Sequence, residues 1–76
     1  METKADRRMV SRLGHKMFMH EAAILRNMGC KEDEMWNETR EMCYEDAEKY
    51  LKRPDVVCLS RIHQPLKAYS LWLKGE

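Results

Sequence analysis

Apolar side chains recur every three or four residues along most of this chain, which is the spacing of one face of an α-helix. The pattern predicts helices over residues 9–28, 35–52, 56–63 and 66–74. One stripe of the first helix carries Met9, Leu13, Met17, His20, Ile24 and Met28, and one stripe of the second carries Trp36, Thr39, Cys43, Ala47 and Tyr50. We therefore expect an all-α protein with one domain over residues 1–76, a small helical hairpin followed by short C-terminal helices.

The expected helices are separated by residues that interrupt helical geometry. Gly29 suits a helix C-terminus because glycine tolerates a positive φ. Pro54 should end the second helix, because proline disfavours helical geometry in the residue before it. Asp55 is expected to cap the third helix at Val56. Pro65 lacks an amide donor and should divide the C-terminal segment near residues 63–64.

The first helix is long for so small a domain, and the second is shorter. We therefore expect the N-terminal part of its stripe, with Met9, Leu13 and Met17, to be buried against another protein, since an exposed apolar stripe usually marks an interface. Ile24 and Trp72 are predicted to belong to the same partner interface. The alternative is that the stripe is simply the core of this chain.

One glycine and the distribution of charge add further expectations about contacts. Gly14, inside the first helix, is expected to mark a bend or a close helix contact. Residues 1–20 carry a net +3, residues 21–55 a net −4 and residues 56–76 a net +2, within an overall charge of +1. This distribution suggests contacts with more than one charged surface, or a solvated charged coat. The near-neutral total argues against a nucleic-acid partner, and charges interrupt every window long enough to span a membrane.

Three cysteines offer the clearest candidate chemistry. Cys30 and Cys43 flank the turn between the two antiparallel helices, where a bridge would stabilise a hairpin that has little core. Closing such a loop contributes about 3 kcal/mol in the chain-entropy model. We predict a disulfide between Cys30 and Cys43. Pairing of Cys43 with Cys58 and free thiols remain the alternatives.

Other sites receive less support from the sequence. Cys30, Cys43, Cys58 and His63 are ligand types that suit Zn²⁺, but no close pair of cysteines is present, as structural zinc sites usually require. The three histidines, His15, His20 and His63, are scattered over separate segments. No glycine-rich phosphate loop occurs. We therefore predict no catalytic residues, no cofactor, no metal and no small-molecule substrate.

The run Glu21-Ala22-Ala23-Ile24-Leu25-Arg26, then Cys30, Cys43 and Tyr50-Leu51, resembles a known family. It is similar to the cysteine-containing helical hairpin of the PDSW-type accessory subunit of mitochondrial respiratory complex I, in its short plant-like form. The similarity covers residues 21–51. The loop after Cys30 is acidic here, whereas the plant-like forms are more basic.

The resemblance implies a non-catalytic structural role. It places the chain on the intermembrane-space side of the mitochondrial inner membrane, peripheral to the membrane arm, with other subunits of the complex as partners. It also implies the Cys30–Cys43 disulfide. The alternatives are a free helical adaptor or assembly factor of the same compartment, and a nucleic-acid or ribosome-associated protein that uses its basic N-terminal helix.

Overall fold

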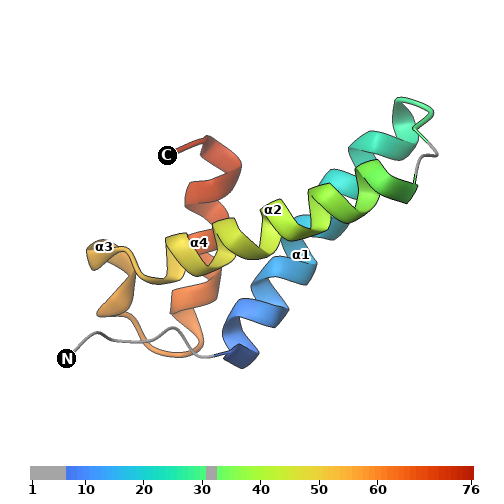
Figure 1. Ribbon diagram of the computed structural model, residues 1–76. Coiled ribbons are helices and arrows are strands. Elements are labelled where there is room, and N and C mark those ends of the chain that lie inside the picture. The colour runs from blue at the N-terminus through green and yellow to red at the C-terminus, as the bar shows by residue number, and fades with distance from the viewer. Residues whose placement is uncertain (1–6, 31–32) are drawn as a thin grey trace.

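The computed structural model of the protein describes residues 7–30 and 33–76. These residues form four α-helices and no strand: α1 (Arg7–Asn27), α2 (Asp33–Leu51), α3 (Pro54–Val57) and α4 (His63–Lys74). The predicted all-α fold is thus confirmed. The two long helices α1 and α2 form an antiparallel hairpin, and α4 lies beside the half of the hairpin where α1 begins and α2 ends (Figure 1). The hairpin turn therefore projects from one end of a molecule that measures 42 × 22 × 18 Å.

The end of α1 forms as the sequence predicts. Gly29 has a φ of 80°, in the left-handed region that favours glycine. The Cys30 amide donates to the Leu25 carbonyl at 2.9 Å and the Gly29 amide donates to the Arg26 carbonyl at 3.0 Å. These two bonds satisfy carbonyls that the end of a helix would otherwise leave unpaired.

The beginning of α3 differs from the prediction. Its first residue is Pro54, whose fixed φ suits that position, and Arg53 precedes it without a side-chain cap. The Asp55 carboxylate instead receives two hydrogen bonds from the Arg53 guanidinium, both at 3.1 Å. The predicted helix over residues 56–63 is therefore a single turn that starts earlier, and Asp55 does not cap it.

Pro65 does not divide the C-terminal segment, which corrects another prediction. It is the third residue of α4, within the first turn. The first four amides of a helix have no partner inside that helix, so the missing proline donor costs nothing there. The Gln64 side-chain amide donates to the Leu51 carbonyl at 3.0 Å and ties the start of α4 to the end of α2.

All four helices contribute to one hydrophobic core. Its buried members are Leu13, Met17, Phe18, Ala22, Cys43, Ala47, Leu51, Val56, Ala68 and Leu71. Leu13 is 2% exposed and Met17 is fully buried. The expectation that these two residues are buried against another protein is therefore wrong, because α2 packs along α1 as far as Gly14 and both residues lie in the core that all four helices share.

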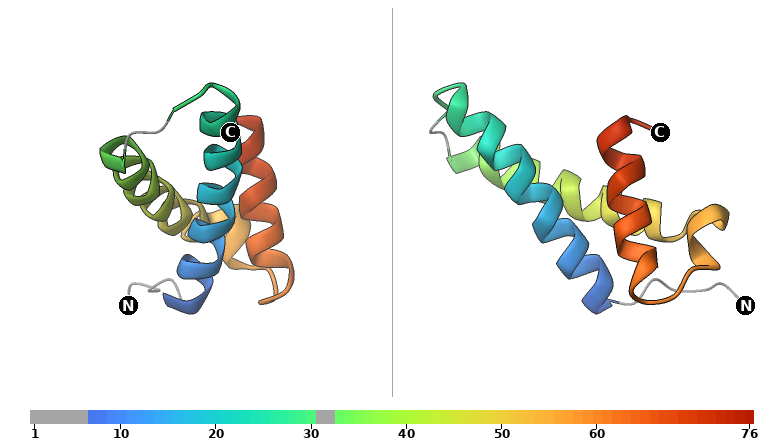
Figure 2. Two further views of the ribbon diagram at one scale, coloured as in Figure 1. Left: turned by 90° about the vertical axis from the view of Figure 1, so that its right-hand side faces the viewer. Right: turned by 180° about the vertical axis from the view of Figure 1, so that it is seen from behind.

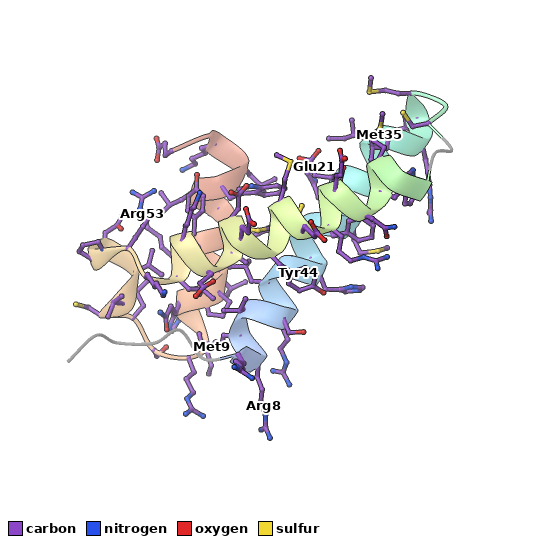
Figure 3. The ribbon with its side chains drawn as sticks, viewed as in Figure 1. Arg8, Met9, Glu21, Met35, Tyr44 and Arg53 are labelled. Atoms are coloured by element: carbon purple, nitrogen blue, oxygen red, sulfur yellow. The ribbon has the colours of Figure 1, made fainter. Side chains whose placement is uncertain are left out.

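Gly14 lies at a close contact between α1 and α2. A Cβ atom built there would lie 2.9 Å from Cγ of Tyr44, with two further ring atoms nearer still. Figure 3 shows Tyr44 on α2 where that helix crosses α1. The close helix contact predicted from this glycine is confirmed.

Across residues 7–30 and 33–76, no helix is both long enough and apolar enough to span a membrane.

Candidate functional site

The three cysteines lie in different environments and all are free thiols. Cys30 lies at the hairpin turn, where its Sγ is 3.4 Å from Sδ of Met35. Cys43 is buried in the core on α2, and Cys58 is exposed after α3. The chain therefore has no disulfide, and the predicted Cys30–Cys43 bridge is absent.

The register of the hairpin explains why this bridge does not form. Cys30 lies beside Met35, and Cys43 follows Met35 by eight helical residues, which is about 12 Å along the axis. A disulfide needs Cα atoms within about 7 Å. Glu21, well inside α1, faces Cys43 instead, and both line one hollow. Two cysteines can flank a turn in sequence without lying opposite each other across it.

That hollow, of about 210 Å³, lies between α1, α2 and α4. It is lined by Glu21, Thr39, Met42, Cys43, Asp46 and Trp72. The Trp72 indole donates to the Asp46 carboxylate at 3.3 Å. Burial, and then the negative charges of Glu21 and Asp46, raise the pKa of Cys43 to about 11. Because the thiolate is the reactive form, Cys43 is not a nucleophile at neutral pH.

The raised pKa predicts a pH dependence of stability. The unfolded chain loses the Cys43 proton above a pKa of about 9.0, whereas the folded chain keeps it to about 11. The contribution of the Cys43 thiol to the free energy of unfolding is fully present below pH 9.0. It decreases by roughly 2–3 kcal/mol as the pH rises to about 11. Urea unfolding of the wild type and of Cys43→Ala should show this extra decline only in the wild type. Parallel pH profiles would contradict the proposed environment of the thiol.

The histidines do not converge on a cysteine or a metal site. In the described ranges, no group of three or more His, Cys, Asp or Glu side chains stands close enough to hold a metal ion. His15 is exposed, and His63 shares a 2.7 Å hydrogen bond with Ser60. His20 packs edge-on against the rings of Trp72 and Tyr69, with centroids 5.6 and 6.4 Å away. His20 thus contributes to the contact between α1 and α4.

Trp72, one of the predicted partner contacts, is half-buried within this chain by Asp46 and His20. Met9 also packs on the core, and it is partly buried. Ile24, in contrast, is exposed. Of the five residues predicted to meet a partner, Ile24 is therefore the one whose side chain is open on the surface.

Exposed apolar side chains gather at two places. We call the first the tip cluster, which consists of Ile24, Met28 and Met35 near the turn end of the hairpin. Figure 3 shows Met35 at this end of the molecule. We call the second the α4 outer face, which consists of Ile62, Leu66 and Leu73. The sequence contains both sets, but Ile62, Leu66 and Leu73 look the same in sequence as the buried Leu71. Sequence reasoning therefore missed the α4 outer face as a surface.

The fold also separates charge. Residues 7–20 hold four basic residues and no acid, and residues 56–75 hold three basic residues and no acid. These two segments lie side by side, because Lys16 and His20 contact Tyr69. The acidic residues concentrate on α2, where Glu38, Glu41, Glu45 and Glu48 are exposed. The uneven charge was visible in the sequence, but only the fold combines its two basic segments.

No protein-family model matches the chain, and comparison with curated proteins and with solved structures finds no match either. What the molecule does is therefore inferred from the tip cluster, the α4 outer face and the distribution of charge.

Proposed function

We propose that this protein is a non-catalytic structural subunit that docks on a larger protein assembly through its tip cluster. The observation that carries the proposal is the exposure of this cluster: Met28 is 72% exposed, and Ile24 and Met35 are exposed beside it. Full burial of one such side chain is worth about 1.5–3 kcal/mol. Methionine also adapts its shape to the surface that covers it.

The position of the tip cluster supports docking. The hairpin turn lies at the far end of the elongated molecule, away from α3 and α4 (Figure 1). A partner can therefore enclose the tip without disturbing the core, which is centred on the other half of the hairpin. Ile24 lies in the last turn of α1, and Met28 directly follows the helix, with its amide donating to the Ile24 carbonyl at 3.0 Å.

The assembly that we propose is a mitochondrial respiratory complex, specifically the membrane arm of complex I on its intermembrane-space side. The resemblance over residues 21–51 supports this choice, and it includes the α1 segment that carries Ile24. The Cys30–Cys43 disulfide is no longer part of the proposal, since both cysteines are free. Partners would be neighbouring protein subunits.

The experiment compares Met28→Glu with Met19→Glu. Both replace an exposed methionine, Met19 within α1 and Met28 directly after it, and only Met28 belongs to the tip cluster. Each variant is expressed at native level in cells that lack the wild-type chain, and native electrophoresis measures the fraction that co-migrates with NADH dehydrogenase activity. We expect Met28→Glu to weaken the association by about 2 kcal/mol, or roughly 30-fold, as at an interface hot spot.

Met19→Glu should co-migrate like the wild type. Equal co-migration of both variants would contradict the role of the tip cluster. The same gels separate a subunit from an assembly factor: a subunit is stoichiometric in the mature complex, whereas an assembly factor associates only with incomplete forms.

A further inference from the structure

The α4 outer face is a straight apolar stripe. Ile62, Leu66 and Leu73 are separated by four and seven residues, which places them on one line along a helix. Ile62 is 73% exposed and Leu66 is 54% exposed. From Ile62 to Leu73 the stripe runs about 16 Å. Seen from behind, α4 stands in front of α2, and no other helix crosses its outer side (Figure 2).

Basic side chains flank this stripe along both edges. On one edge, Lys67 and Lys74 each follow a leucine of the stripe by one residue, about 100° further around the helix. On the other edge, Lys16 of α1 holds its ammonium group 4.7 Å from the centre of the Tyr69 ring. Arg12 lies one turn before Lys16 on α1 and is exposed. An aliphatic stripe with cations on both sides therefore occupies this face.

Acidic groups do not neutralise the stripe. Residues 7–20 of α1 contain no acid, and residues 56–76 hold three basic residues against the one acid Glu76, which follows α4 at its C-terminal end. The carboxylate bound to α4 is that of Asp46, which accepts from Trp72 on the side of α4 that faces α2. Asp55 is paired with Arg53. Basic residues therefore outnumber acidic ones around the α4 outer face.

We propose that the α4 outer face binds the surface of an anionic lipid bilayer, with α4 lying flat among the headgroups. Ile62, Leu66 and Leu73 enter the boundary of the acyl chains, and the lysines extend their ammonium groups to the lipid phosphates. Aliphatic side chains along the centre of the face suit lipid rather than nucleic acid, whose bases stack on aromatic rings. This proposal does not depend on the tip cluster, and it leaves that cluster free to meet a protein.

The first test measures co-sedimentation of the purified full chain with phosphatidylcholine vesicles, with and without phosphatidylserine. We expect binding only to the vesicles that contain phosphatidylserine, and weaker binding as salt is added. Each lysine near such a surface contributes about fivefold, so Lys67→Gln with Lys74→Gln should weaken partitioning roughly 25-fold. The matched control is Lys49→Gln with Lys52→Gln, which makes the same change in net charge on exposed residues at the end of α2.

The second test keeps the charge and removes the aliphatic groups. Leu66→Ser with Leu73→Ser should weaken partitioning by about tenfold or more. Both leucines are exposed, and circular dichroism should confirm that each variant stays folded. Failure of the wild type to bind anionic vesicles at low salt would overturn the proposal. So would wild-type binding by the leucine variant, which would indicate a surface that recognises polyanions such as RNA by charge alone.

Discussion

Replacing Leu13 by alanine should lower the free energy of unfolding by about 2–5 kcal/mol, the range found when a buried leucine is truncated. Leu13 is 2% exposed and belongs to the same core as the fully buried Met17. A chain of this length has a total stability of roughly 4–11 kcal/mol, so the loss is a large fraction of it. Urea unfolding followed by far-ultraviolet circular dichroism measures the difference.

The matched control is Leu66→Ala, the same substitution at a residue of the α4 outer face. It should change stability by about 0.5 kcal/mol or less, because Leu66 is mostly in solvent. Equal stability of the two variants would show that Leu13 is not part of the core, and Leu13 would then be available to a partner.

Replacing Gly14 by alanine should also destabilise the protein, by about 1–3 kcal/mol, although alanine is the better helix former. The added methyl group would meet the Tyr44 ring at less than 3 Å, including Cγ, the ring atom bonded to Cβ. The ring cannot relieve this contact by a small rotation, so the two helices must move apart. Thermal unfolding of the purified variant measures the loss.

Gly14→Ala should have the opposite effect on stability when the Tyr44 ring is absent. In a Tyr44→Ala background, Gly14→Ala should stabilise the chain by up to about 1 kcal/mol, because only the helical preference of alanine remains. This double-mutant cycle isolates the contact between the two residues. A destabilising effect of similar size in both backgrounds would place the cause elsewhere than in the Tyr44 ring.

Helical periodicity and glycine chemistry were sufficient to predict the hairpin. The apolar spacing located α1 and α2 to within two residues at each end, and Gly29 ends α1 for the reason that the sequence indicated. A close helix contact was one of the two alternatives expected at Gly14, although Tyr44 was not identified as its partner. These features depend on local backbone geometry, which can be predicted from the residue types at nearby positions.

The error over Leu13 and Met17 came from the expected reach of the elements that cover α1. The second helix was expected to be too short to cover the first half of α1, and the C-terminal segment was expected to be divided at Pro65. Instead α2 packs along α1 as far as Gly14, and α4 is continuous. The outcome depends on where α4 begins, because proline is tolerated in the first turn and disruptive beyond it. Helix boundaries are decided by tertiary contacts such as the bond from Gln64 to Leu51, which periodicity does not reveal.

The error over the disulfide came from register. Cys30 and Cys43 flank the turn, but Cys30 lies at its start and Cys43 lies well along α2, opposite Glu21.

The α4 outer face could not be predicted from the sequence for a related reason. Apolar residues occupy both sides of α4, with Ala68 and Leu71 buried and Leu66 and Leu73 exposed. Which side faces the core depends on packing against α1 and α2.

The central claim is that this chain works as a docked subunit of a larger assembly, and the size of its native particle tests that claim most directly. Cells are solubilised gently, and the endogenous untagged chain is followed by native electrophoresis and immunodetection. We predict that it migrates in stoichiometric amount with a particle many times its own 9.1 kDa, together with NADH dehydrogenase activity. Migration of the chain as a free 9.1 kDa protein would contradict the claim.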